Sequence, residues 1–376
     1  MKKREFLRTL GLAGLGLAAR PWLHSGVPFR AGQPEFGRKH WAWLATDLLS
    51  SPDSMQRRFA VMRKAGIDAI LPEIYDGHRA YYKSAHLPVE ELWLENLLPL
   101  ARAEGLEVHG WMWSMPCNIE EVRRDHPEWF VVNRKGESAA EKPAYVDYYK
   151  FLCPSHRGVH EFLAATVTEL CQHRDLAGVH LDYIRYPDVI LPEALQPKYG
   201  LTQDREYPEF DYCYCDDCRN DFKNQTGIDP MTLENPPANA LWRQFRYDRI
   251  THLVNDTLIP IARAHGKAIT AAVFPDWNLV RQQWPAWKLD AVMPMLYHTL
   301  YKKGASWIRE ETEKGVRSLQ GRAPLYSGIL IFRLDEKEFT AAVEASLEGG
   351  ANGVVLFEGG AMSDALWQAF RAVVGR

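Results

Sequence analysis

The sequence has no excess of charge of either sign. Its 376 residues carry 45 Lys and Arg against 48 Asp and Glu, which is a formal net charge of −3. This balance gives no sign of nucleic acid or of an anionic membrane surface as a partner. Beyond about residue 30, no stretch approaches the ~18 consecutive apolar residues of a membrane-spanning helix, so no membrane contact is expected after the N-terminal segment.

Two kinds of motif are also missing. No glycine-rich phosphate-binding sequence follows the first predicted strand, which argues against a dinucleotide-binding fold. The predicted strand ends carry no His-x-His pair, which argues against a catalytic metal, so we expect catalysis to require no cofactor. Hydrophobic residues, in contrast, make up 46% of the chain, and the 13 Trp and 16 Tyr suit either core packing or stacking against sugar rings.

The N-terminus has the layout of an export signal. A basic segment, 1–8, precedes an apolar run rich in Gly and Ala from Thr9 to Ala19. Residues 3–8 also resemble the twin-arginine export motif, with lysine in place of its first arginine. We therefore expect residues 1–30 to direct export, by the general or the twin-arginine route, to the periplasm or the exterior. An uncleaved anchor is the alternative, because no clear A-x-A cleavage site follows.

Strand-like and helix-like segments alternate along the rest of the chain. The predicted strands are 39–47, 68–75, 107–115, 178–185, 267–275, 290–298, 324–332 and 352–358. The clearest predicted helices are 51–66, 92–104, 158–172, 241–265 and 363–374. Glycines 66, 105, 266 and 350 each close a helix just before a strand, as a left-handed C-cap does. Eight such units predict one α/β domain over residues 38–375, a (β/α)8 TIM barrel rather than an open doubly wound sheet.

Two connections are much longer than the others. One, 116–155, follows the third strand, and the other, at about 187–240, follows the fourth and contains cysteines. Both follow strands, so both belong on the face where the carboxyl ends of barrel strands meet and active sites are built. The two loops therefore predict a walled cleft on this face.

The stretch 178–187, Gly-Val-His-Leu-Asp-Tyr-Ile-Arg-Tyr-Pro, reads as a strand that runs out into a functional loop. Alternation puts His180 and Asp182 on the inward face and Leu181 and Tyr183 on the apolar outward face. Asp182 is then close to the carboxyl end of its strand, where parallel barrels keep their chemistry. A structural role in a turn or a helix cap is the alternative.

Acidic side chains recur at predicted strand ends, which converge on one mouth of a barrel. They are Asp47, Glu73, Asp182, Asp276 and Glu358. Glycoside hydrolysis needs two carboxyls, one that protonates the leaving oxygen and one that acts as nucleophile or activates water. The mouth can supply such a pair, although individual acids could instead cap helices or pair with Arg and Lys.

Aromatic and hydrogen-bonding side chains accompany these acids and suit a carbohydrate cleft. The candidate substrate-binding residues are Asp47, Tyr75, Trp111, Trp113, His180, Arg185, Asp276, Trp277, Tyr297 and His298. Two alternatives stay open at this point. Trp111 and Trp113 could fill the inner layers of the barrel, and His180 could be a hydrogen-bonded core histidine that positions Asp182.

Three of the six cysteines, Cys213, Cys215 and Cys218, lie within six residues in the second long loop. One interpretation is a structural zinc site with a fourth ligand from elsewhere in the chain. The other, favoured by export, is one or two disulfides. Either would hold the loop in place. Cys171, in a helical pattern, is expected to be a buried thiol.

The motif at 178–187, together with Cys-Pro-Ser-His-Arg-Gly-Val-His at 153–160 and Asp-Ala-Val-Met-Pro-Met-Leu-Tyr at 290–297, resembles the bacterial glycosyl-hydrolase-like family 10 proteins. These are distinct from the family 10 xylanases. The resemblance implies an exported barrel, distantly related to the α-amylase type, that acts on polysaccharide or cell-wall glycan. In that wider clan the aspartate that ends strand four is the nucleophile, which corresponds to Asp182.

The sequence departs from the family pattern in two places. Many members have a second acid after the strand-four aspartate, where this chain has Tyr183, and the clan's strand-five glutamate is replaced here by Asp276. We therefore expect an exported glycoside hydrolase with Asp182 as nucleophile or essential carboxylate, Glu73 as first choice of acid/base and Glu358 as second. The alternatives are a barrel that binds glycan without cleaving it and a metal-dependent carbohydrate deacylase.

Overall fold

The computed structural model describes residues 37–46 and 51–375, so the predicted export signal and Asp47 lie outside the described residues. Within them the strands are β1 (Trp41–Leu44), β2 (Ala69–Tyr75), β3 (Glu107–Trp113), β4 (Gly178–Asp182), β5 (Ala268–Val273), β6 (Ala291–Pro294), β7 (Tyr326–Leu330) and β8 (Gly353–Phe357). They pair in parallel in the order β6-β5-β4-β3-β2-β1-β8-β7. Parallel bridges between Val292 and Leu325 and between Met295 and Gly328 connect β6 to β7. The predicted (β/α)8 barrel is confirmed.

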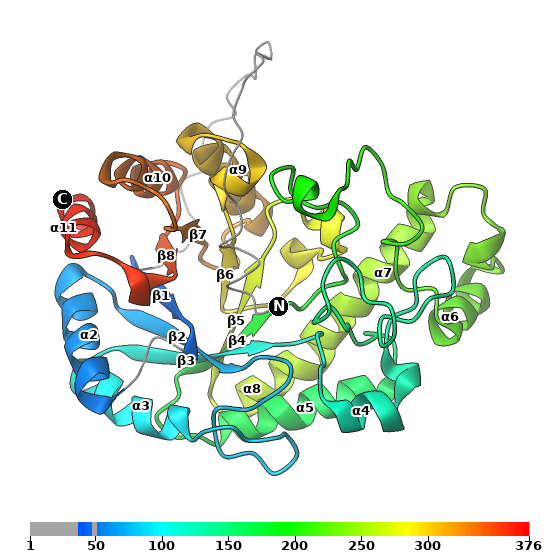
Figure 1. Cartoon of the computed structure of the whole chain (residues 1–376), viewed down its shortest axis with the longest axis horizontal. Coiled ribbons are helices and arrows are strands. Elements are labelled where there is room, and N and C mark those ends of the chain that lie inside the picture. The colour runs from blue at the N-terminus through cyan, green and yellow to red at the C-terminus, as the bar shows by residue number, and fades with distance from the viewer. Residues whose placement is uncertain (1–36, 47–50, 376) are drawn as a thin grey trace.

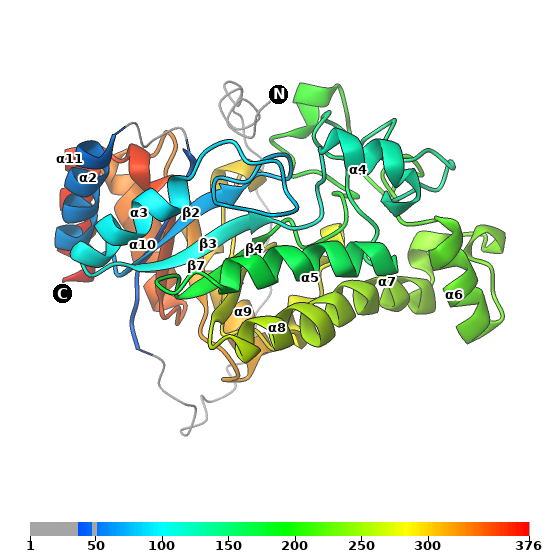
Figure 2. The same ribbon diagram turned by 90° about the horizontal axis from the view of Figure 1, so that it is seen from below.

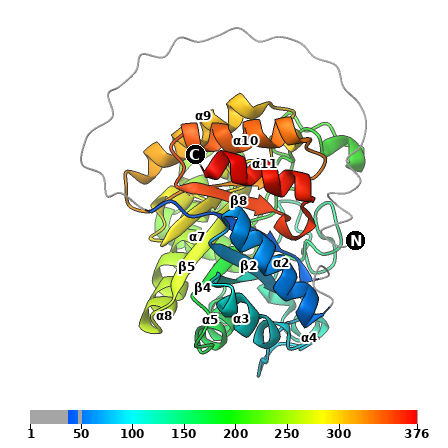
Figure 3. The same ribbon diagram turned by 90° about the vertical axis from the view of Figure 1, so that its left-hand side faces the viewer.

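Helices surround this barrel. They are α2 (Pro52–Ala65), α3 (Trp93–Ala103), α4 (Glu120–Asp125), α5 (Arg157–Cys171), α6 (Asp216–Thr226), α7 (Ala240–His252), α8 (Ile259–Ala264), α9 (Ala305–Leu319), α10 (Glu336–Glu348) and α11 (Asp364–Val374). A π-helical segment, Leu253–Leu258, joins α7 to α8, so the helix predicted over 241–265 is one continuous rod. Short 3₁₀ turns lie at Pro127–Trp129, Gln196–Tyr199, Pro230–Thr232, Pro236–Ala238, Trp277–Val280, Trp284–Ala286, His298–Tyr301 and Gly359–Ala361. Figure 3 shows the strands enclosed by α2, α3, α5, α8, α9, α10 and α11.

Helix α2 illustrates how the sequence sets these elements. Its N-cap, Ser51, accepts a hydrogen bond from the Ser54 N–H, and Pro52 occupies the first turn, where its missing N–H costs nothing. Its buried face consists of Met55, Phe59, Met62 and Ala65. The helix ends at Gly66, whose φ of 105° is open to glycine and strained for other residues. The same spacing predicted this helix from the sequence alone.

The two long connections lie together at one end of the barrel. Figures 1 and 2 both show α4, from the loop after β3, and α6, from the loop after β4, beyond the ends of the strands on the right-hand side. Their backbones also pair, because Tyr214 donates to the Val132 carbonyl at 2.8 Å and Arg134 donates to the Asp211 carbonyl at 3.0 Å. The two loops therefore pair with each other beyond the strand ends; that they wall a substrate cleft stays a prediction. None of the helices in ranges 37–46 and 51–375 is long and apolar enough to span a membrane.

Candidate active site at the barrel mouth

Asp182 is the last residue of β4, which lies between β3 and β5 in the barrel. Its side chain is buried, with 4% of its surface exposed. Each carboxylate oxygen has a donor: the Trp111 indole donates to Oδ2 at 3.1 Å, and the Tyr183 backbone N–H donates to Oδ1 at 2.7 Å. An ionised carboxylate only accepts hydrogen bonds, so the ionised form suits this pair of donors. Asp182 is therefore held in one orientation at the mouth.

Tyr183 does not continue the alternation of the strand. Its φ is 51°, in the left-handed region that few non-glycine residues adopt, and β4 ends one residue earlier. The predicted strand over 178–185 is thus too long, and the prediction that Tyr183 faces outward with Leu181 is wrong. The turn places the Tyr183 ring on the cavity wall, 4.8 Å from the Trp113 ring centroid. The same turn aims its N–H back at Asp182.

Glu73 lies in β2, two strands from Asp182, and is 8% exposed. The Trp113 indole donates to its Oε1 at 2.6 Å. Trp111 and Trp113 stand two residues apart on β3 and so share a face, and the register pairs Glu73 with Trp111 and Asp182 with Trp113. One strand thus supplies an indole donor to an acid on each neighbouring strand. That the two indoles also stack on a sugar stays a prediction.

A cavity at the mouth is lined by residues from the ends of β4, β5, β6 and β8 and from both long loops. The lining consists of Tyr149, Asp182, Tyr183, Arg185, Asp188, Leu191, Pro192, Leu195, Phe274, Met295, Tyr297, Leu300, Tyr301 and Phe357. Three of these, Asp182, Arg185 and Tyr297, were predicted site residues. The wall is largely aromatic and apolar, with a few polar groups, which is the character of a small-molecule or sugar cleft.

Arg185 forms a buried ion pair in this wall. Its Nη1 lies 2.9 Å from Asp188 Oδ2, which also accepts the Tyr149 hydroxyl at 3.0 Å. Burial alone would lower the pKa of Arg185, but Asp188 raises it above its ordinary value, so the guanidinium stays charged. Four rings, those of Tyr149, Phe151, Tyr183 and Phe274, lie within 4.7 to 5.8 Å of its Cζ. Such packing fixes the guanidinium in place.

Tyr297 follows β6, and its ring stacks on Phe357 with centroids 5.7 Å apart. Burial raises its pKa well above the ordinary value, and the charges of Asp182 and Glu358 raise it further. The phenol therefore stays protonated and remains a hydrogen-bond donor at neutral pH. Glu358 itself directly follows β8 and is half-buried. The charges of Asp182 and Glu358, the first-choice nucleophile and the second-choice proton donor, thus both act on the Tyr297 phenol.

His180 lies deeper in the barrel than the cavity. It is fully buried, its Nε2 faces the Trp43 indole N–H at 3.0 Å, and its Nδ1 lies 2.8 Å from the Thr270 hydroxyl. These contacts match the open alternative of a hydrogen-bonded core histidine. Because His180 precedes Asp182 by two residues on the same strand face, it anchors the strand that carries Asp182.

Glu73, Glu358, Trp111 and Trp113 are not among the residues that line the cavity, and four other predicted residues are also absent from the lining. Asp276 is exposed, accepts the Asn278 N–H as an N-cap, and borders a separate surface pocket with Trp277. Tyr75 is fully buried in β2, and burial raises its pKa well above the ordinary value. His298 is also buried, and burial lowers its pKa. That these residues bind substrate stays a prediction.

Sequence reasoning missed Asp188, Tyr149 and Tyr183 as cavity residues. Asp188 had one usable signal, since it stands three residues after Arg185 and directly after Pro187, a spacing at which an Arg–Asp pair can close. Tyr149 had none, because it lies 36 residues before Arg185 in the other loop.

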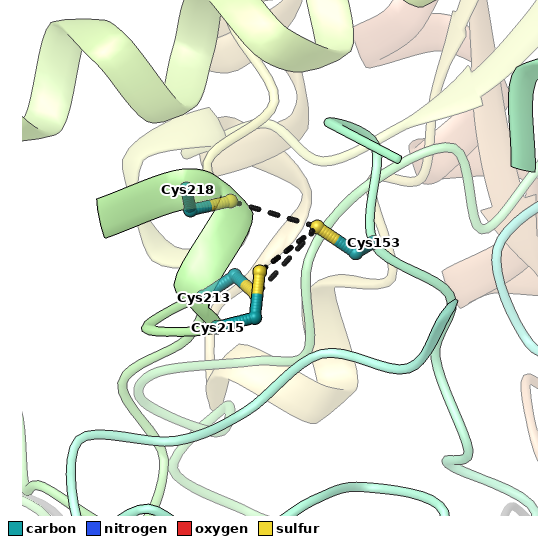
Figure 4. A group of neighbouring side chains, drawn as sticks. All are labelled: Cys153, Cys213, Cys215 and Cys218. Atoms are coloured by element: carbon teal, nitrogen blue, oxygen red, sulfur yellow. Dashed lines mark hydrogen bonds between the residues drawn. The ribbon is translucent and has the colours of Figure 1, made fainter. Parts of the chain in front are cut away.

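Four cysteine sulfurs gather where the two long loops meet, and Figure 4 shows Cys153 facing the other three. Cys153 occupies the position of the fourth ligand, which the sequence left unassigned. A search of the described residues for three or more His, Cys, Asp or Glu side chains that could hold a metal ion finds this group. The group lies in the loops and not among the carboxylates of the mouth. It therefore does not provide the metal site at the mouth that a metal-dependent deacylase would need.

The sequence profile of the glycosyl hydrolase-like 10 family matches residues 41–318. The fold is similar to the glycoside hydrolase domain of PgaB (BpsB) from Bordetella bronchiseptica, at 12% identity and a TM-score of 0.68, over 89% of this chain and 98% of that one. It is also similar to the β-amylase catalytic domain from Paenibacillus polymyxa, at 8% identity and a TM-score of 0.64, over 90% and 99%. A β-galactosidase from Marinomonas ef1 has 12% identity and a TM-score of 0.62, over 90% of this chain and 59% of its own. No curated protein sequence matches. At these identities the solved structures show a shared fold.

Proposed function

The chain belongs to the glycosyl hydrolase-like 10 family, and we propose that it hydrolyses O-glycosidic bonds of an oligo- or polysaccharide at the mouth of its barrel. One observation carries the proposal: Asp182 ends β4 on the cavity wall, with a separate donor to each of its oxygens. The resemblance of the 178–187 motif favours polysaccharide or cell-wall glycan as the substrate class. Export by residues 1–30 would bring the protein to such a substrate.

Asp182 serves in this proposal as the nucleophile or as the base that activates water. Both roles need an ionised carboxylate whose lone pairs point in a fixed direction before the substrate arrives. The Trp111 indole and the Tyr183 N–H provide that orientation without reorganisation during the reaction. Because β4 itself is anchored by His180, the carboxylate is positioned from the barrel core as well as from the loop.

The proton donor is Glu73 or Glu358, with Glu73 as first choice. Glu73 is buried two strands from Asp182, and its Oε1 accepts the Trp113 indole. Glu358 directly follows Phe357, a cavity residue, and its charge acts on the same Tyr297 phenol as that of Asp182. The proton donor must reach the glycosidic oxygen, while the second carboxylate acts at the anomeric carbon. Glu73 lies in β2 and Glu358 directly follows β8, so a pair of variants separates the two candidates.

One observation favours the alternative of a barrel that binds glycan without cleaving it. Asp276, at the strand-five position of the clan's acid/base, is exposed and caps a 3₁₀ turn away from the cavity. If neither Glu73 nor Glu358 takes over that role, the cavity would hold a sugar against its aromatic wall and leave the bond intact. Binding and cleavage are distinguished by experiment.

The test measures reducing-end release from α-glucans, β-glucans, host-type glycans and peptidoglycan strands, with Asp182→Asn, Glu73→Gln and Glu358→Gln beside the wild type. Asparagine and glutamine keep the shape of the carboxyl but remove its charge and its proton transfer. We expect Asp182→Asn and one glutamine variant to lose at least ~10²-fold in kcat on the substrate that the wild type cuts. Glu348→Gln, an exposed glutamate on α10, is the control and should cut at the wild-type rate.

Three results decide between these functions. An Asp182→Asn variant that cuts as fast as wild type makes Asp182 structural and ends the proposal. Loss in Glu358→Gln but not in Glu73→Gln reverses the order of the two proton donors. A glycan that binds to wild type and to all variants, with no release of reducing ends, supports the binding barrel.

A further inference from the structure

The sulfurs of Cys153, Cys213, Cys215 and Cys218 form a compact four-membered group, drawn in Figure 4. All four lie within 4.8 Å of one another. From Cys153 the distances are 3.5 Å to Cys218, 3.6 Å to Cys215 and 3.7 Å to Cys213. A tetrahedral zinc ion with Zn–S bonds of about 2.3 Å separates its sulfurs by about 3.8 Å. The observed distances are close to the edge length of that tetrahedron.

The alternative of disulfides fits these positions less well. A disulfide brings two sulfurs to about 2.05 Å, whereas the other three sulfurs of the group lie 3.5 to 3.7 Å from that of Cys153. Two disulfides would also have to divide the cluster into separate pairs, but Cys153 is almost equally far from its three neighbours. The four sulfurs are therefore arranged around one central point, as for a single metal ion, and not in two bonded pairs.

The surroundings suit a closed metal site. Cys153, Cys213 and Cys218 are fully buried and Cys215 is half-buried, so the protein supplies all four positions and none opens to substrate. The Val132 N–H points at Cys213 Sγ at 3.5 Å. Ser155 Oγ lies 3.1 Å from Cys218 Sγ, where its hydroxyl can donate to a thiolate. Such outer contacts orient metal-bound sulfur and offset its charge.

Local sequence places three of the ligands. Cys215 is the N-cap of α6, and Cys218 lies in the first turn, so both sulfurs face the same end of that helix. Cys213 precedes them in the strand-like segment that pairs with the other long loop at Val132. Cys153 comes from that other loop, 60 residues earlier in the chain than Cys213. The chain thus brings two ligand segments together by tertiary contact.

We propose that these four cysteines bind one structural zinc ion that fastens the two long loops to each other behind the cavity. Binding converts four thiols and Zn²⁺ into one zinc tetrathiolate and four released protons, with no change of oxidation state. The site holds the cavity wall because Cys153 belongs to the same short segment as Tyr149, whose hydroxyl contacts Asp188 and Arg185.

The first experiment measures the metal content of the full chain purified without chelators, and again after reconstitution with Zn²⁺ and with Co²⁺. We expect about one zinc per chain, and a Co²⁺ form with the visible absorption of a tetrahedral thiolate site. Cys153→Ser should reduce the zinc content at least tenfold. Cys117→Ser and Cys171→Ser remove buried cysteines outside the cluster and are the matched controls, expected to retain the metal.

A second variant keeps the test decisive if Cys153→Ser does not fold. Cys215→Ser changes the half-buried ligand at a position where serine is a favourable N-cap, so α6 should still form. In this variant, and in wild type stripped of metal, amide exchange should speed up at least tenfold in residues 146–153 and 187–192, independently of activity. The segments of α10 and β8, far from the cluster, serve as the internal reference.

Three outcomes would overturn the proposal. One is a non-reducing mass spectrum that shows a disulfide within the cluster of the freshly purified protein. Another is less than about 0.1 equivalent of metal before and after reconstitution, at a level equal to that of Cys153→Ser. The third is iron in place of zinc, since a tetrathiolate site also accepts iron. None of these results bears on whether Asp182 cleaves glycans, so the two proposals fail separately.

Discussion

Replacing Asp188 by asparagine tests the electrostatic account of the cavity wall. Arg185 and Asp188 have 4% and 3% of their side-chain surfaces exposed, so the pair has almost no solvent to screen it. The asparagine side chain would keep an acceptor oxygen of similar shape but lose the charge that compensates the buried guanidinium. The Asp188→Asn substitution therefore measures how much the carboxylate charge contributes to the free energy of unfolding.

The expected magnitude follows from the contacts. Removing one partner of a buried ion pair costs about 3–5 kcal/mol, because the remaining charge is left uncompensated. The retained amide and the rings around Arg185 recover about 1 kcal/mol of this loss. We expect Asp188→Asn to lower the free energy of unfolding by about 2–4 kcal/mol. At roughly 2 °C per kcal/mol for a chain of this size, Tm should fall by about 4–8 °C.

The assay is thermal and urea unfolding followed by circular dichroism, at neutral pH. Asp175→Asn is the control, since Asp175 pairs with Arg102 at 3.3 Å on the surface, where the side chains are 42% and 76% exposed. That change should cost less than about 0.5 kcal/mol. A double variant, Arg185→Met with Asp188→Leu, should recover most of the loss because no unpaired charge remains. If Asp188→Asn unfolds within about 0.5 kcal/mol of wild type, the charge of Asp188 does not stabilise the cavity wall.

Two further predictions concern named carboxylates. Hydrogen bonds from His109 (2.7 Å) and Lys39 (2.6 Å) lower the pKa of Glu107 from its ordinary 4.5 to about 2. The ionised carboxylate therefore stabilises the folded protein above pH ~4.5, and this stabilisation is lost as the pH falls to about 2. Acid unfolding should show the stability gap between wild type and Glu107→Gln closing over that window, and a constant gap would contradict the assignment. Trp113→Phe keeps the ring but removes the N–H that reaches Glu73, so kcat/KM should fall about tenfold and the proton-donor limb of the pH–rate profile should move to higher pH. An unchanged profile would show that Glu73 is not the proton donor.

The barrel could be predicted because its signals are local. Helix α2 shows this well, since a serine cap, an early proline, an apolar spacing and a closing glycine all lie within sixteen residues, 51–66. The eight strands alternate with such helices, and strict alternation leaves few topologies other than a closed parallel barrel. The place of Asp182 at the end of β4 follows from the same local pattern.

The errors and omissions arise where the backbone leaves regular structure. The period of two predicted an outward Tyr183, but the left-handed turn at its φ of 51° redirects the side chain to the cavity. The aromatic pattern predicted that Trp111 and Trp113 contact a sugar, and it carried no sign that their N–H groups reach Asp182 and Glu73. Which acceptor an indole N–H reaches depends on the register between neighbouring strands, and the sequence of one strand does not determine that register.

The sequence by itself determined the order of strands and helices, the acid at the end of strand four and the three clustered cysteines of the second loop. Tertiary structure alone decided that Cys153 joins those cysteines and that Tyr149 reaches Asp188 from 39 residues away. The physical reason is that periodicity, caps and turns act between near neighbours in the chain. Contacts between two long loops depend instead on closure of the whole barrel, which brings the ends of β3 and β4 side by side.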